Sequence, residues 1–177
     1  MIETSVKSVL FVCLGNICRS PTAEALFRQK SSAVELNISC DSAGTADWHI
    51  GSPPYQPMQE AALVRGINMS KLRARQISIH DFTNFDLIIA MDEKNRANLN
   101  TLCPERVDKV RLLTEFAQEN LGYDYVPDPY YTRGFNQTLD IIDQSLSGLI
   151  ENLNSGTAAD PFRPPSFDGI VDLPHMG

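Results

Sequence analysis

The stretch that decides the fold lies near the amino terminus and reads Val9-Leu10-Phe11-Val12-Cys13-Leu14-Gly15-Asn16-Ile17-Cys18-Arg19-Ser20-Pro21-Thr22-Ala23-Glu24-Ala25. Its first four residues form an apolar run typical of a short buried strand. Pro21 suits the first position of a helix, Ser20 suits its N-cap, and apolar residues recur after them. The sequence therefore predicts a strand, a short turn and a helix, in that order.

The turn between this strand and this helix has the properties of a phosphate-binding site. Backbone N–H groups at a helix N-terminus attract small anions. Gly15 lacks the Cβ that would keep the backbone away from such an anion. Arg19, six positions after Cys13, carries a planar fork of donors that matches phosphate oxygens in pairs. At the same offset the three other cysteines meet no arginine, so Cys13 alone begins such a loop.

Two interpretations of Cys13 are open at this level. Free cysteines are usually core residues, and Cys13 then only ends a core strand. Alternatively its sulfur is a nucleophile at the base of the anion site, which the glycine, the arginine and the helix start all favour. A nucleophilic sulfur must be ionised, and the helix dipole, the loop N–H groups and Arg19 all favour the thiolate. The hydroxyl of Ser20 can add a hydrogen bond to the sulfur, which does not exclude its role as N-cap.

Composition limits the classes of protein to consider. A chain of 177 residues suits one domain with a real core. A net charge of −7 argues against a nucleic-acid surface or an anionic-membrane anchor. No apolar run approaches the ~18 residues of a membrane span, and the first residues lack a signal-peptide core. We expect a cytoplasmic protein that is a monomer, with a weak dimer as the alternative, and that binds neither nucleic acid nor membrane.

The cysteines and histidines indicate no metal and no disulfide framework. Four cysteines are too few for a disulfide scaffold in a chain of this length, and no Cys-x2-Cys or histidine pair indicates zinc. A nucleophilic thiol also needs a reducing compartment. We therefore expect activity without a metal ion or any other cofactor.

Strand-like and helix-like runs alternate along the rest of the chain. Strands are expected at Val6–Val12, Glu35–Ser42, Phe85–Met91 and Lys109–Leu113. Helices are expected at Pro21–Ser31, from Pro57 to a stop at Gly66, from an N-cap at Asp92 through Leu99, at Glu115–Asn120 and at Phe135–Asn154. This alternation predicts a single-domain, three-layer α/β/α fold with a central, mostly four-stranded parallel sheet.

The domain boundary is expected near the end of the last helix. Residues 1–154 then form the domain. Residues 155–177 contain four prolines and little periodicity, so we expect a disordered or loosely docked tail.

In a parallel sheet, ligands bind beyond the carboxyl ends of the strands, where Cys13 is expected.

The quoted stretch closely resembles the active-site loop of the low-molecular-weight protein tyrosine phosphatases. The similarity extends over about Val6 to Leu153, in order and at family-like spacing. It continues through Asp41-Ser42-Ala43-Gly44-Thr45, Asp47-Trp48-His49, Arg73-Ala74-Arg75-Gln76, Ala90-Met91-Asp92 and Asp128-Pro129-Tyr130-Tyr131. One departure is Lys71-Leu72-Arg73, which fills the place where the family often has a histidine that supports the loop.

The resemblance implies hydrolysis of phosphotyrosine in proteins, and of small aryl phosphates, through a phosphocysteine. Cys13 is then the nucleophile, Arg19 the phosphate ligand and Asp128 the general acid. The residues implied to bind the substrate, or a phosphate-like anion, are Leu14, Gly15, Asn16, Ile17, Cys18, Ser20, Trp48, Tyr130 and Tyr131. Ser42 is implied to hold the loop through Asn16, Asp92 to fix the catalytic region, and Cys18 to act as a redox partner of Cys13.

Plainer roles exist for four of these residues. Asp128 lies between two prolines, where an aspartate is usually part of a turn. Trp48 is alternatively a buried loop anchor, Asp92 is equally an N-cap, and Cys18 is alternatively a packing residue.

Three other functions share features with tyrosine phosphatase. A protein-arginine phosphatase of the same fold is the nearest alternative, but it carries threonine where this loop has Ile17. An arsenate reductase of this fold needs two further relay cysteines, and Cys40 and Cys103 lie far apart in sequence. A non-catalytic phosphopeptide-binding module is expected to lose Cys13 or Asp128, and both are present.

Overall fold

Four parallel strands form the central sheet of the structure, a computed structural model that describes residues 6–155. The strand order is β2-β1-β3-β4. The strands are β1 (Ser8–Cys13), β2 (Ser39–Gly44), β3 (Leu87–Ala90) and β4 (Val110–Leu112). The predicted α/β fold with a four-stranded parallel sheet is confirmed.

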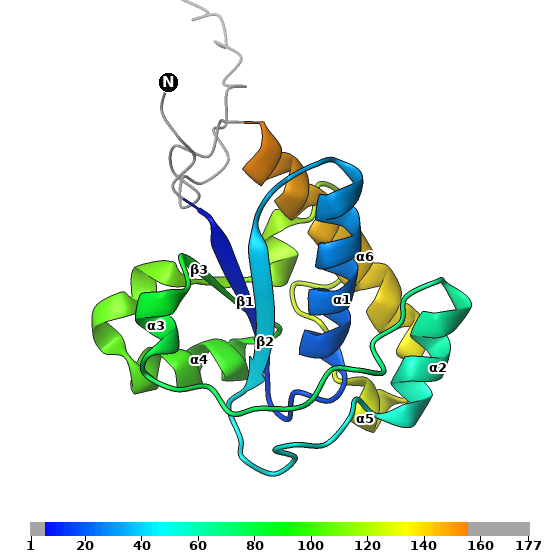
Figure 1. Ribbon diagram of the computed structural model, residues 1–177, viewed down its shortest axis with the longest axis horizontal. Coiled ribbons are helices and arrows are strands. Elements are labelled where there is room, and N and C mark those ends of the chain that lie inside the picture. Colours follow the sequence, from blue (N-terminus) through cyan, green and yellow to red (C-terminus); the bar gives the residue numbers. More distant parts are fainter. Residues whose placement is uncertain (1–5, 156–177) are drawn as a thin grey trace, which may run out of the picture.

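Helices cover both faces of this sheet (Figure 1). One face carries α1 (Arg19–Ala33) and α6 (Phe135–Asn154), with α2 (Gln56–Val64) packed against α6 and the short α5 (Pro129–Thr132) nearby. The other face carries α3 (Asp81–Asn84) and α4 (Glu93–Leu102). Two 3-10 helices flank β4, namely η1 (Pro104–Lys109) and η2 (Leu113–Phe116).

Alternating side chains of β1 supply both cores. Val9 and Phe11 are fully buried among the residues of α1 and α6. Leu10 and Val12 are fully buried on the opposite face, against α3 and α4. Successive residues of a strand point to opposite faces, so a strand covered on both sides reads as a continuous apolar run.

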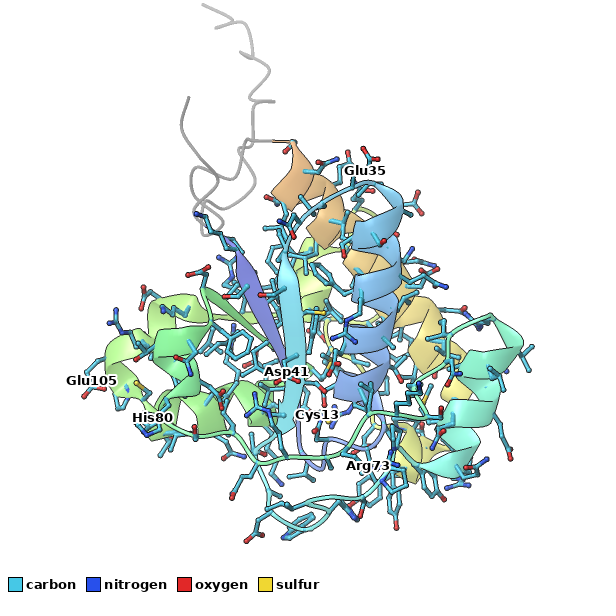
Figure 2. The ribbon with its side chains drawn as sticks, in the orientation of Figure 1. Cys13, Glu35, Asp41, Arg73, His80 and Glu105 are labelled. Atoms are coloured by element: carbon cyan, nitrogen blue, oxygen red, sulfur yellow. The ribbon has the colours of Figure 1, made fainter. Side chains whose placement is uncertain are left out.

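The strand order places the end of β1 at a crevice. The strands that follow β1 in the chain lie on its two opposite sides, β2 on one and β3 on the other. Ligands bind at such a switch point, beyond the carboxyl ends of the strands. Figure 2 shows Cys13 at this end of the sheet, beside the start of α1.

One predicted strand begins later than expected. The run Glu35–Ser42 enters the sheet only at Ser39. Glu35 adopts a left-handed conformation, with φ of 56°, and the Leu36 N–H donates to the Ser31 carbonyl at 2.9 Å. These residues form a turn that ends α1, and their apolar side chains pack on the core from it.

The short elements were the least predictable. The helix expected at Glu115–Asn120 is wrong, because the chain forms the 3-10 helix η2 there instead. α3 and α5 were not predicted, since four residues are too few to show a period. The helix Phe135–Asn154 is confirmed at both ends. The predicted tail lies outside the described residues, apart from Ser155.

Within residues 6–155 there is no helix both long enough and apolar enough to span a membrane.

Candidate active site

The sulfur of Cys13 lies at the floor of a cleft, where β1 ends and the chain turns toward α1 (Figure 2). Only 3% of the residue is exposed. The Cys13 Sγ lies 2.9 Å from the Ser20 hydroxyl oxygen and accepts the Asn16 backbone N–H at 3.3 Å. No side chain caps the first turn of α1, so its N–H groups remain available to an anion. These donors suit a thiolate.

Ser20 contacts the sulfur, as predicted, but it does not cap the helix, so only the N-cap prediction is wrong. α1 begins two residues earlier than predicted, at Arg19, and Pro21 is therefore its third residue and not its first. The Ser20 hydroxyl accepts a hydrogen bond from Asn16 Nδ2 at 2.8 Å. Because that bond uses a lone pair of the oxygen, the hydroxyl hydrogen is free to point at Cys13 Sγ.

Asn16 holds the shape of the loop from below. Its φ is 57°, a left-handed conformation that asparagine tolerates better than most residues. Its Nδ2 also donates to the Ser42 hydroxyl at 2.9 Å, and its Oδ1 accepts the Arg75 backbone N–H at 3.0 Å. The Asn16–Ser42 hydrogen bond implied by the resemblance is therefore present. The side chains of Asn16 and Ser20 lie beneath the cleft and do not line it.

Glu24 ends this chain of hydrogen bonds and was not singled out from the sequence. Its Oε1 accepts from the Ser42 hydroxyl at 2.7 Å, and its Oε2 accepts from Arg28 at 3.0 Å. The residue is 4% exposed. Burial raises the pKa of Glu24 above its ordinary value, although the bonds from Ser42 and Arg28 act in the other direction. Nothing in the helical pattern distinguishes a buried glutamate from an exposed one, so no sequence signal marked it.

Arg19 is a buried cation with three anchoring contacts. Its Nη1 donates to Asp92 Oδ2 at 2.6 Å and to the Val126 carbonyl at 3.0 Å, and its Nη2 lies 3.3 Å from Asp128 Oδ2. Burial by itself lowers the pKa of Arg19, but Cys13, Asp128 and Asp92 outweigh it and the net shift is upward. The guanidinium therefore stays charged beside the sulfur.

Asp92 makes the contacts that both of its suggested roles require. One of its oxygens accepts the Asn95 N–H and caps α4, while the other accepts from Arg19. The start of α4 and the catalytic loop are thus joined through one carboxylate.

Asp128 faces Arg19 from a separate loop. Its Oδ1 accepts the Tyr130 N–H at 3.0 Å and caps α5, which leaves Oδ2 directed toward Arg19 and the cleft. The loop that carries Asp128 is bonded to α6, because the Thr138 hydroxyl donates to the Pro127 carbonyl at 3.3 Å. The turn role and a site role for Asp128 are therefore compatible.

Aromatic side chains form the rim of the cleft. Trp48 is 66% exposed, which excludes a buried loop anchor, and it lines the cleft with Tyr130 and Tyr131. The rings of these two tyrosines pack edge to face with centroids 5.4 Å apart. The remaining predicted substrate-binding residues that line the cleft are Leu14, Gly15, Ile17 and Cys18.

His49 also lines the cleft and was not predicted to do so. A Cβ on Gly15 would lie 3.0 Å from His49 Cδ2, so the glycine lets the imidazole pack against the loop. His49 was visible only as part of a quoted motif, and no pattern in a single sequence assigns it a contact.

Cys18 is a second buried thiol of the cleft. It is 4% exposed, and neither it nor Cys13 is in a disulfide. Burial raises the pKa of Cys18, and the nearby Cys13 and Asp128 raise it further. Cys18 is therefore a neutral thiol at rest.

The segment that lacks the family's histidine is held by other contacts. Arg73 donates to the carbonyls of Ser70 and Leu72. Arg75 forms ion pairs of 3.0 Å with both Asp41 and Asp81, while its backbone supports Asn16. Glu24 and Arg75 thus anchor the loop from two sides.

No cluster of three or more histidine, cysteine, aspartate or glutamate residues that could hold a metal ion occurs in the described part of the chain.

Comparison with known proteins places these features in a family. Residues 8–159 match the sequence profile described as "Low molecular weight phosphotyrosine protein phosphatase". The chain is 41% identical over 149 residues to low molecular weight protein-tyrosine-phosphatase YfkJ of Bacillus subtilis, covering 82% of this chain and 95% of that protein. It is 45% identical over 148 residues to a low molecular weight phosphotyrosine protein phosphatase of Schizosaccharomyces pombe, covering 80% and 94%.

Solved structures agree with the sequence comparisons. The crystal structure of YfkJ from Bacillus subtilis superposes with a TM-score of 0.82 at 39% identity, covering 86% of this chain and 97% of that one. A protein tyrosine phosphatase from Entamoeba histolytica, crystallised with Hepes in its active site, gives a TM-score of 0.80 at 37% identity, covering 85% and 98%.

The fold and the cysteine–arginine loop define a phosphatase. The chain belongs to the low-molecular-weight protein-tyrosine-phosphatase family, whose named activity is the hydrolysis of phosphotyrosine.

Proposed function

We propose that this protein hydrolyses phosphotyrosine in protein substrates through a phosphocysteine formed on Cys13. The observation that carries the proposal is the convergence of Cys13, Arg19 and Asp128 on one cleft with an aromatic rim. Ser20 and the Asn16 N–H stabilise the thiolate at its floor. The rim offers flat apolar surfaces to a phenyl ring.

The first step forms a bond between Cys13 Sγ and phosphorus. The bond from phosphorus to the phenolic oxygen breaks, its electron pair goes to that oxygen, and Asp128 supplies a proton to it. The charge on the phosphoryl oxygens is stabilised by Arg19 and the loop N–H groups. Asp92 and Val126 hold Arg19 Nη1, which leaves the Nη2 edge to the substrate.

Substrate binding exchanges partners at Arg19. In the free protein, Nη2 lies 3.3 Å from Asp128 Oδ2. A phosphate at the same edge of the guanidinium replaces that carboxylate, which is then free to meet the leaving oxygen. The Tyr130 N–H remains hydrogen-bonded to Asp128 Oδ1 during this exchange. The other carboxylate oxygen, Oδ2, is therefore the one that carries the transferred proton.

The second step regenerates the enzyme. Water attacks phosphorus, the ionised Asp128 takes its proton, and the bond to sulfur breaks to give inorganic phosphate and the Cys13 thiolate. Each proton lent in the first step is recovered in the second, so no other co-reactant is needed.

The nearest alternative substrate is phosphoarginine, and Ile17 bears on that choice. Its side chain lines the cleft, where a branched apolar group favours an aryl phosphate. Phosphate release should be measured side by side from one peptide carrying phosphotyrosine and from its phosphoarginine counterpart. We expect the phosphotyrosine peptide to have the higher kcat/KM. In Ile17→Thr, the kcat/KM values of the two peptides should lie closer together. A preference for phosphoarginine in the unmodified protein would overturn the proposed substrate.

A further inference from the structure

Arg133 is fixed in place directly after the rim tyrosines. Its φ of 63° is left-handed, and its N–H donates to the Pro129 carbonyl at 2.9 Å at the end of α5. The guanidinium carbon lies 5.5 Å from the ring centroid of Tyr55 and 5.1 Å from that of Phe135. Its Nη1 donates to the Tyr55 hydroxyl at 2.9 Å. Backbone and side chain are therefore both constrained, although the residue is exposed.

The charge of Arg133 is not neutralised by a neighbour. Within residues 6–155 no carboxylate lies in ion-pair distance of its guanidinium, in contrast to most arginines of this chain. Carboxylate partners are present for Arg19, Arg28, Arg65, Arg75, Arg96 and Arg111. A guanidinium has five N–H donors, and the Tyr55 hydroxyl uses one of those of Arg133. A charged, partly unbonded fork is thus presented to solvent on a protein of net charge −7.

This cation lies next to the cleft. The ring of Tyr55 packs against that of Tyr130, with centroids 5.2 Å apart, and Tyr130 lines the cleft. The Tyr55 backbone N–H donates to the carbonyl of Ile17 in the catalytic loop at 2.8 Å. Arg133 is also close enough to the buried Cys18 to act on its ionisation. One aromatic ring therefore separates the guanidinium from the wall that receives the substrate.

We infer that Arg133 determines specificity by binding a substrate carboxylate located close to the phosphotyrosine in the peptide. The inference rests on the proposed function. An extended peptide advances about 3.4 Å per residue, so an aspartate or glutamate one to three residues from the phosphotyrosine reaches past the Tyr130 wall. The planar fork of arginine matches a carboxylate through two parallel hydrogen bonds. The substrate class is thus a phosphotyrosine peptide with an acidic neighbour.

The test compares peptides that differ by one charge. Each of the three positions on either side of phosphotyrosine carries glutamate in one peptide and glutamine in its partner. The kcat/KM ratio of each pair is measured at low ionic strength. At one or more positions on one side, we expect glutamate to raise kcat/KM about three- to tenfold in the unmodified protein, the range of an exposed charge pair with good geometry. Arg133→Gln should bring that ratio close to one, and added salt should reduce it.

Two controls separate a contact from a general charge effect. Arg106→Gln makes the same change of net charge in η1, whose Glu105 lies at the opposite side of the molecule from α5 (Figures 1 and 2). Its glutamate-to-glutamine ratios should match those of the unmodified protein. Arg133→Lys keeps the charge without the fork and should retain part of the preference. Turnover of a small aryl phosphate by each variant reports that the chemistry is intact.

The outcomes distinguish the inference from the proposed function. Peptides that are hydrolysed with the same ratios by the unmodified protein and by Arg133→Gln would overturn the role of Arg133 alone. If Arg106→Gln also lost the preference for glutamate over glutamine, that preference would be an effect of net charge and not of Arg133. Failure to hydrolyse any of the phosphotyrosine peptides would instead overturn the proposed function.

Discussion

At the floor of the cleft, Cys13, Asn16 and Arg19 are 2–3% exposed, and each makes at least two hydrogen bonds or close polar contacts. At the rim, Trp48 and Tyr131 are 66% and 70% exposed. The floor holds one arrangement of charges, as transition-state stabilisation requires. The rim consists of rigid aromatic rings that are exposed to solvent. Such rings can contact peptides whose residues around the phosphotyrosine differ. Changes to the floor should therefore lower kcat, while changes to the rim should act mainly on KM.

The largest effect is expected at Cys13, the proposed nucleophile. Cys13→Ser should reduce turnover of every substrate to the background, because a serine hydroxyl is not ionised by the donors that stabilise a thiolate. Phosphate or vanadate binding should remain measurable by calorimetry, since Arg19 and the loop N–H groups are unchanged. Substantial phosphatase activity in this variant would place the chemistry elsewhere.

Replacement of Asp128, the proposed general acid, should slow substrates to different degrees. Asp128→Asn is expected to slow phenyl and alkyl phosphates by about 10²- to 10⁴-fold. An activated aryl phosphate should be slowed less, because a good leaving group needs less help from a proton. A leaving-group series of kcat values measures this difference. Equal losses across the series would make Asp128 a structural cap of α5 only.

Oxidation by peroxide tests the role of Cys18, the second buried thiol of the cleft. We expect mild peroxide to inactivate the enzyme through a sulfenic acid on Cys13, which the neighbouring Cys18 traps as a disulfide. A thiol reductant should then restore most activity. Cys18→Ser should keep its untreated activity within a few-fold but lose most of this recovery.

The matched control for that experiment is Cys40→Ser, which alters a half-buried thiol in β2. It should recover as the unmodified protein does. Full recovery of the Cys18→Ser protein, without any Cys13–Cys18 bridge in peptide mass maps, would make Cys18 a packing residue.

A rim substitution should have a smaller and different effect. Trp48→Ala removes an exposed ring that makes no bond to the floor, so we expect KM for phosphotyrosine peptides to rise about three- to tenfold while kcat changes little. Steady-state kinetics with one peptide separates the two constants. If Trp48→Ala lowered kcat as much as a substitution at the floor of the cleft does, the proposed difference between floor and rim would be contradicted.

The smallest effect concerns the buried carboxylate beneath the floor. Because burial raises the pKa of Glu24 in the folded state, its contribution to stability is present below about pH 4.5 and is lost as pH rises through the folded value. Glu24→Gln stays neutral, so its free energy of unfolding should increase relative to the unmodified protein as pH rises. Each unit of pKa shift corresponds to about 1.4 kcal/mol.

Urea unfolding over a pH series measures this difference. Glu60→Gln, at an exposed position of α2, is the control. A difference between Glu24→Gln and the unmodified protein that does not change with pH would contradict this reading of Glu24.

The sequence was most informative where local chemistry is dense. The apolar run ending at Cys13, the helix after Arg19 and the amphipathic period of α6 predicted the main layers of the fold. The parallel order of strands then predicted that Cys13 lies at a ligand-binding edge.

Contacts between distant segments were not predictable in the same way. The Ser42–Glu24 bond and the packing of His49 over Gly15 each join residues that no period relates. The N-cap prediction for Ser20 was wrong: a serine before a proline at a helix start usually caps the helix. Here its hydroxyl contacts the sulfur and accepts a hydrogen bond from Asn16. Single-sequence patterns describe local geometry, and these roles arise from tertiary contacts.

The central claim, that phosphate passes through Cys13, can be tested directly by trapping the intermediate. Asp128→Asn combined with an activated aryl phosphate favours its accumulation, because formation then needs little acid whereas hydrolysis still needs the base. The reaction is stopped within milliseconds by denaturation, and the peptides are mapped by mass. The account predicts a phosphate adduct on the peptide containing Cys13, and none with Cys13→Ser. Turnover with no adduct on Cys13, or with the adduct on another residue, would contradict it.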